Sequence, residues 1–164
     1  MEKERLEYTI GRLDHYFDSV NNKTTVYIAI NTFLTGGIIA LMTQMEDILP
    51  QQFWLQFFFG AILLLGILSL IILAWASIPY ISLNTKIDSL YYFGSISDKK
   101  FQDFSSCSEN QTKKGNLKDL RSQVHIMSIG LTKKFSKLTW AGILLIVQFI
   151  LLAPLTYLLI SKLL

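Results

Sequence analysis

Three long stretches of this chain contain no charged residue, and polar segments separate them. They cover residues 24–45, 53–78 and 139–161. Each is longer than the roughly 20 apolar residues that a helix needs to cross about 30 Å of hydrocarbon. A chain in lipid must bond every backbone N–H and C=O within its own segment, so each stretch is expected to be a helix. The pattern predicts three transmembrane helices.

Apolar stripes precede the first and third stretches and run on into them. The first stripe follows the alternating three- and four-residue spacing of a coiled-coil seam and comprises Leu6, Ile10, Leu13, Phe17, Val20, Thr24, Tyr27, Asn31, Leu34, Ile38 and Leu41. The second comprises Leu117, Leu120, Val124, Met127, Leu131, Phe135 and Leu138. Such stripes must be covered by one another or by other subunits. We therefore expect a homo-oligomer, with a tetramer as the guess for its number of subunits.

One polar residue of the first stripe has the chemistry of a subunit contact. An asparagine at a seam position in lipid bonds across helices and fixes their register, so Asn31 is a candidate. A local bond to a backbone carbonyl is an equal alternative. Thr24 and Thr35 lie near the same face. The sequence predicts Thr24, Asn31 and Thr35 as a pore or oligomer seam.

Local patterns predict how the remaining segments fold. Proline lacks an N–H and clashes with the preceding turn, so Pro79 is expected to end the second span. The further expectations are a short helix over 83–93, a helix capped by Ser97 that carries Phe101 and Phe104, a loop over 105–115, and a capping box of Asn116 with Asp119.

The basic residues indicate the orientation. All of the 15 Lys and Arg residues except Lys162 lie in residues 1–23 and 79–138. Because basic loops stay on the cytoplasmic side, the N-terminus is expected inside and the C-terminus outside. The expected organisation is all-α: a cytoplasmic amphipathic helix (1–23), a first span (24–45), a periplasmic loop (46–52), a second span (53–78), a basic helical cytoplasmic region (79–138), a third span (139–161) and a periplasmic tail (162–164).

The basic region also offers candidate ligands for phosphate. Lys118, Arg121 and His125 are three and four residues apart and so lie along one side of a helix. Free N–H groups at the helix start near Asn116 would add to that site. The alternatives are a solvated helix face and lysines that serve only to set the topology. The predicted phosphate-binding set is Lys113, Lys114, Lys118, Arg121, His125, Lys133 and Lys134.

Other chemistry is sparse. The stretches contain no Asp, Glu, Lys, Arg or His, which argues against ion-coupled transport. Two histidines and one cysteine are too few for a convincing zinc site, and no Gly-rich phosphate loop is present, so we expect no enzyme, metal or cofactor. Any passage through the spans would be lined by apolar and neutral polar groups, as in a gated pore. The neutral polar residues are Asn31, Thr32, Thr35, Gln44, Gln56, Ser69, Gln148 and Thr156.

Several short motifs occur in an order and spacing that match a known family. They are Asn22-Lys23-Thr24, Ile28-Ala29-Ile30-Asn31, Ile78-Pro79, Tyr92-Phe93-Gly94-Ser95-Ile96, Gln123-Val124-His125 and Lys134-Phe135-Ser136-Lys137-Leu138. On these motifs the chain resembles the small three-span membrane effectors of bacterial anti-phage systems, typified by the Pycsar transmembrane effectors.

The resemblance implies an effector in the bacterial inner (plasma) membrane. It would cause ion leakage under control of a nucleotide made by a partner nucleotidyltransferase or cyclase. A single-stranded DNA oligomer, as in Hailong-type systems, is a second possible signal. The alternative function is a membrane anchor or scaffold that conducts nothing and recruits a soluble partner through its cytoplasmic helices.

Overall fold

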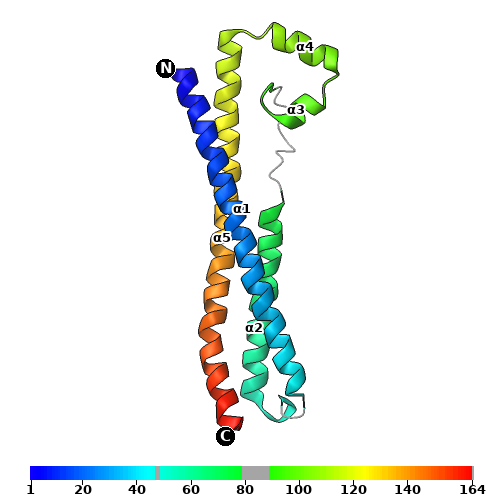
Figure 1. Ribbon diagram of the computed structural model, residues 1–164, viewed down its shortest axis with the longest axis vertical. Helices are drawn as coiled ribbons and strands as arrows, with labels where there is room; N and C mark the ends of the chain where they lie inside the picture. The colour runs from blue at the N-terminus through cyan, green and yellow to red at the C-terminus, as the bar shows by residue number, and fades with distance from the viewer. Residues whose placement is uncertain (47–48, 79–88, 164) are drawn as a thin grey trace. The chain divides into compact units, whose positions relative to one another are not determined.

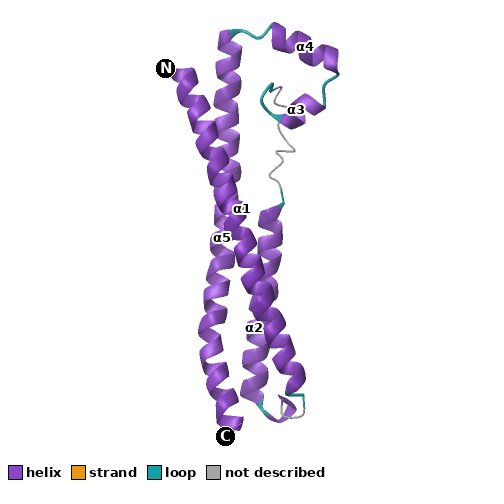
Figure 2. Ribbon diagram, viewed as in Figure 1, coloured by secondary structure: helices purple, strands orange, loops and turns teal. Residues whose placement is uncertain are grey.

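The computed structural model describes residues 1–46, 49–78 and 89–163, and helices dominate these ranges (Figure 1). Figure 2 shows helices and connecting loops, with no strand in the described ranges. The predicted all-α membrane class is confirmed. In chain order the elements are α1 (Glu2–Gln44), the 3₁₀ helix η1 (Leu49–Gln51), α2 (Phe53–Ser77), α3 (Phe93–Ser97), α4 (Phe101–Glu109) and α5 (Lys113–Leu163).

Three of these helices have the length and composition of membrane spans. They are α1, α2 and α5, and each contains a long apolar stretch. α2 begins at Phe53, where the sequence predicted a start, and ends at Ser77. Its C-terminal neighbour Ile78 has an extended backbone (φ −63°, ψ 130°), the conformation that a following proline imposes. Pro79 itself lies outside the described residues.

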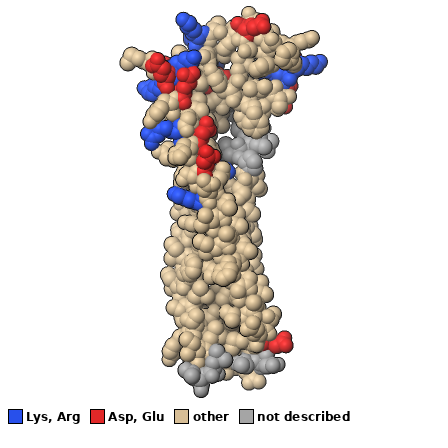
Figure 3. All heavy atoms as spheres, in the orientation of Figure 1, with Lys and Arg blue, Asp and Glu red and all other residues tan. Residues whose placement is uncertain are grey.

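The chain divides into two compact units. Residues 1–19 and the described part of 80–133 form one, which we call the polar unit; residues 20–79 and 134–164, where described, form the other, the apolar unit. α1 and α5 contribute to both because each stripe continues from a polar half into an apolar one. In Figure 3 most of the visible Lys, Arg, Asp and Glu side chains belong to the polar unit.

The apolar unit has a core to which all three long helices contribute. Ile38 of α1, Leu55, Phe59 and Ile62 of α2, and Leu155 of α5 form a buried cluster. Many other apolar side chains of this unit face outward, Phe33 and Trp54 among them, at 81% and 62% exposure. A surface of this kind suits lipid and would be unfavourable in water.

The two predicted stripes are largely confirmed as the inward faces of α1 and α5. Leu6, Val20, Thr24, Asn31 and Ile38 are buried, and most other members of the first stripe are half-buried. Leu41 is the exception, since it is exposed. Leu120, Leu131 and Leu138 of the second stripe are buried, and the rest are half-buried. Residues of the same chain therefore provide the cover.

The short elements differ from the sequence-based expectations. Ser97 ends α3 and donates to the Gly94 carbonyl (2.9 Å), so it caps no helix. α4 extends through Glu109, which makes the first half of the expected loop helical. The expected helix over 83–93 falls largely outside the described residues, and 89–92 are not helical.

The capping box of Asn116 with Asp119 is also wrong, because α5 begins earlier, at Lys113. The Thr112 hydroxyl accepts a hydrogen bond from the Gly115 N–H (3.0 Å) and so caps this helix. Asn116 and Asp119 are left free for tertiary contacts.

The core cluster generates a stability prediction. Phe59 is fully buried, so Phe59→Ala should lower the free energy of unfolding by about 3 kcal/mol through the cavity it leaves. Thermal unfolding in detergent, followed by circular dichroism, measures the loss. Phe33→Ala removes the same atoms from an exposed position and is the control. Equal losses in the two variants would contradict the assigned core.

Candidate functional site

Three polar side chains of α5 hold the segment before α3 in the polar unit. Asn116, Asp119 and Gln123 are three and four residues apart, so they share one face of the helix. The bonds run from the Tyr91 hydroxyl to Asn116 Oδ1 (2.6 Å), from the Leu90 N–H to Asp119 Oδ2 (2.8 Å) and from Gln123 Nε2 to Ser89 Oγ (2.8 Å). We call these three residues the α5 ladder.

Two residues of the ladder, and the serine that one of them contacts, are buried. Asp119 and Gln123 are each 7% exposed, and Ser89 is fully buried. Ser89 Oγ also accepts from the N–H groups of Tyr91 and Tyr92 (both 3.1 Å). Buried polar groups are costly unless bonded, so these contacts fix the backbone of 89–92 against α5.

A cavity of about 380 Å³ adjoins the ladder in the polar unit. Its lining residues are Leu90, Tyr91, Ser108, Gln111, Thr112, Lys113 and Asn116. The volume lies in the range of small-molecule sites. Lys113 supplies a positive charge, and the start of α5 supplies backbone N–H groups suited to an anion. Amide, hydroxyl and tyrosine groups complete a lining that can hold a polar, phosphate-bearing molecule.

The structure does not gather the predicted phosphate-binding residues into one surface. Lys113 is the member that lines the cavity just described. Lys114, Lys118, His125 and Lys133 are exposed along α5. The side chains of Arg121 and Lys134 bond to Glu2 and Asn21.

Arg121 forms a two-pronged ion pair with Glu2. Its Nε and Nη2 donate to Glu2 Oε1 and Oε2 (both 2.9 Å). Both side chains are partly exposed, at 58% and 38%, so the pair contributes little stability on its own. Its consequence is chemical, because a phosphate that binds Arg121 must first displace a carboxylate. Reading α5 alone could not reveal a partner near the other end of the sequence.

Lys134 is a buried residue of the apolar unit. It is 9% exposed, and its Nζ donates to Asn21 Oδ1 (2.9 Å). Burial, with a smaller contribution from the charge of Lys137, lowers the pKa of Lys134. Lys137 Nζ bonds the Trp75 carbonyl (3.2 Å) and lies 4.5 Å from the centre of its ring. These two lysines tie α5 to α1 and α2.

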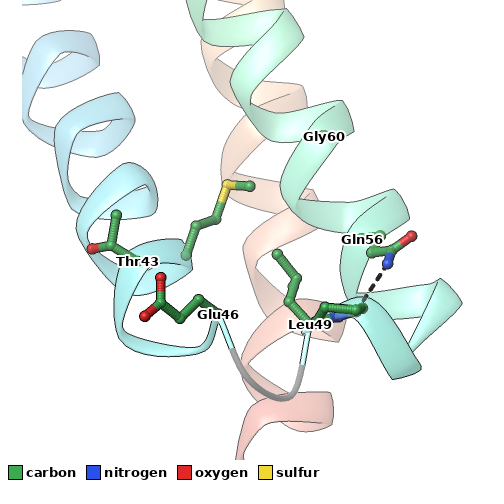
Figure 4. A pocket seen from close by; sticks show the side chains of 7 residues that line it. Thr43, Glu46, Leu49, Gln56 and Gly60 are labelled. Carbon is green, nitrogen blue, oxygen red and sulfur yellow. Dashed lines mark hydrogen bonds between the residues drawn. The ribbon is translucent and has the colours of Figure 1, made fainter.

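A second cavity, of about 520 Å³, lies at the turn between α1 and α2 (Figure 4). Its lining includes Thr43, Glu46, Leu49, Gln56 and Gly60. Gln56 Nε2 donates to the Leu49 carbonyl (3.0 Å). The described lining residues include a carboxylate and no Lys or Arg, so they would repel a phosphate. The cavity beside Lys113 is the better candidate for an anionic ligand.

A polar layer is buried within the apolar unit. It consists of Asn31 and Thr35 of α1, Gly66 and Ser69 of α2, and Gln148 of α5. The hydrogen bonds run from Thr35 Oγ1 to Asn31 Oδ1 (3.3 Å), from Gln148 Nε2 to the Ile62 carbonyl (3.1 Å) and from Ser69 Oγ to the Ala141 carbonyl (3.2 Å). Asn31 Nδ2 and Gln148 Oε1 are buried without a hydrogen-bond partner in the described part of the chain.

The predicted seam of Thr24, Asn31 and Thr35 therefore faces the interior of its own chain. Thr24 donates to the Val20 carbonyl (2.8 Å), so its hydroxyl is satisfied within α1. Asn31 and Thr35 belong to the polar layer. The sequence had marked Ser69 and Gln148 as neutral polar residues, but it gave no sign that Gln148 and Asn31 lie together at Gly66 or that Ser69 bonds to α5. Gly66 was missed, although the spacing Gly66-x-x-Ser69 puts two small residues on one face.

The fold and these sites define a helical membrane protein with three spans and a polar unit that carries a ligand-sized cavity. The family model described as the Pycsar effector protein domain matches residues 5–161. The chain therefore belongs to the Pycsar effector family of transmembrane proteins, as its motifs suggested. Membership makes it a membrane-located effector of anti-phage defence. No curated protein and no solved structure matches the chain.

The ladder generates a prediction about local order. Asp119→Ala removes the acceptor for the Leu90 N–H and thus a charge-assisted bond of about 2 kcal/mol. Hydrogen exchange of the Leu90 amide should accelerate by roughly tenfold or more. Asp103→Ala, an exposed carboxylate in the first turn of α4, is the matched control and should leave that amide unchanged. An unaltered exchange rate in Asp119→Ala would refute the assigned role.

Proposed function

We propose that this protein is an inner-membrane effector of anti-phage defence that assembles as a homo-oligomer and permeabilises the membrane to ions. A nucleotide or oligonucleotide made by a partner nucleotidyltransferase or cyclase controls it. The observation that carries the proposal is the family match over residues 5–161, because it takes in both the spans and the polar unit.

The apolar unit supports permeation over simple anchoring. An anchor needs only apolar side chains, whereas this bundle buries the amides of Asn31 and Gln148 and the hydroxyls of Thr35 and Ser69 within its expected spans. Polar groups inside spans are costly and typically serve transport or helix association. The outward apolar surface of α2, with Trp54, Leu64 and Ile71 exposed, is available to lipid or to further subunits.

The polar unit supports control by an anionic signal. We propose that it lies in the cytoplasm, because it holds most of the basic residues of the chain. The cavity beside Lys113 is the proposed binding site. α5 runs without interruption from Lys113 to Leu163, so the cavity wall, the ladder and Gln148 lie on one helix. A signal that shifts α5 thus has a covalent route to the spans.

Ion flux from liposomes tests the proposal against the scaffold alternative. Reconstituted protein should release trapped ions when the activating signal is present or the inhibiting one is removed. Candidate signals are cyclic mononucleotides, cyclic dinucleotides and short single-stranded DNA. A protein that inserts correctly yet passes no ions under any of these conditions would be the non-conducting scaffold.

The cavity assignment predicts a difference between two neighbouring lysines. Lys113→Gln should weaken binding of the active signal by about tenfold, because it removes a charge-assisted contact. It should also reduce the dependence of affinity on salt. Lys114→Gln makes the same change at an exposed residue outside the lining and is the control. Titrations of both variants at two salt concentrations measure the effect. Equal behaviour of the two variants would exclude this cavity.

A further inference from the structure

The polar layer of the apolar unit contains buried polar atoms that make no hydrogen bond to the described residues. Asn31, Ser69 and Gln148 are fully buried, and Thr35 is 7% exposed. Among the described residues, Asn31 Nδ2 is a donor without an acceptor and Gln148 Oε1 is an acceptor without a donor. A sequence selected only for a stable closed bundle gains nothing from such groups, since apolar residues of similar volume avoid the cost of an unpaired amide.

Five other hydroxyls in or beside the spans behave differently, because each donates to a carbonyl of its own helix. The donors and their carbonyl acceptors are Thr24 to Val20, Thr43 to Ala40, Ser77 to Leu73, Thr139 to Phe135 and Thr156 to Ala153. Side chains of this kind present little polarity to a neighbour. Each of the two amides carries two N–H donors and an acceptor oxygen, which is more than one carbonyl of its own helix can satisfy.

Gly66 allows the layer to form. A Cβ at this position would overlap Thr35 Oγ1, would lie 2.7 Å from Gln148 Nε2 and would lie 3.4 Å from Asn31 Oδ1. The missing side chain therefore makes room for polar atoms from both α1 and α5 against α2. The layer contains atoms of all three helices, so a shift of any one of them changes its contacts.

We propose that this layer is the permeation site of the effector, at which small hydrated ions pass when the three helices shift apart. The inference rests on the function proposed above. In the closed bundle the amides of Asn31 and Gln148 both lie against Gly66 of α2, and in the open form they line the path and bond to water. Neutral donors and acceptors both face the ion, so the layer discriminates weakly between small cations and anions.

A charged side chain introduced into the layer should then make permeation selective for cations or for anions. Gln148→Glu should raise the permeability ratio of potassium to chloride by about tenfold, and Gln148→Lys should lower it, because a fixed charge at contact distance acts strongly outside bulk water. The measurement is the reversal potential of reconstituted protein in a KCl gradient. Gln44→Glu introduces the same charge at an exposed position at the end of α1 and is the control.

A glycine pair provides a test without any charge. Gly66→Ala forces Thr35 or Gln148 to move and should raise ion flux in the absence of signal by about tenfold, since overpacking shifts the balance from closed to open. Gly60→Ala lies on the same helix, meets nothing within 4 Å and carries the same gain in helix propensity. It should leave the flux of the wild type unchanged.

The outcomes separate the two proposals. A wild type that conducts, with unchanged ion selectivity in both Gln148 variants and unchanged flux in Gly66→Ala, overturns the layer as the permeation site and leaves the effector function standing. If the wild type passes no ions with any of the candidate signals present or removed, both proposals are overturned. If the Gln148 variants fail to fold, Gly66→Ala decides alone: raised flux supports the site and flux equal to Gly60→Ala rejects it.

Discussion

A polar group inside a membrane finds no water to bond, and the structure of the apolar unit follows from that constraint. Backbone groups are satisfied by helix formation, which is why α1, α2 and α5 run unbroken through their apolar stretches. The hydroxyls of Thr24, Thr139 and Thr156 bond back to carbonyls of their own helices. Asn31 and Gln148 cannot do so fully, and the three spans converge on them at Gly66.

The same rule organises the polar unit, where burial rather than lipid removes the water. Ser89 is fully buried and accepts bonds from two backbone N–H groups and from Gln123. Asp119 accepts a hydrogen bond from the N–H of Leu90. These contacts give a non-helical segment a defined place on α5. They also create the wall of a cavity at the helix start, where Lys113 and free N–H groups favour an anion.

The basic residues illustrate how one composition serves several purposes. Arg121 is neutralised by Glu2, Lys134 is buried against Asn21, and Lys137 lies over Trp75. Lys114 and Lys118 remain exposed to solvent. The basic residues of α5 thus serve partly as an electrostatic signal for orientation and partly as structural contacts. Lys113 differs from the others named here because it lines a cavity.

The sequence by itself determined the class of the protein. Uncharged stretches longer than a bilayer is thick allow only helices, and stripes at helical spacing identify the inward faces of α1 and α5. Both statements depend on local periodicity, which is present in a single chain. The short elements were harder, because Thr112 rather than Asn116 caps α5 and because residues 105–109, expected in a loop, belong to α4.

Only the tertiary structure decided which side chains meet. Asn31, Gly66 and Gln148 come from three helices, and no spacing rule links their positions. The pairing of Glu2 with Arg121 is equally invisible along the sequence. The physical reason is that hydrogen bonds and ion pairs between helices depend on how those helices rotate and pack. Periodicity predicts which face of a helix is buried, but it does not predict which residues of another helix pack against that face.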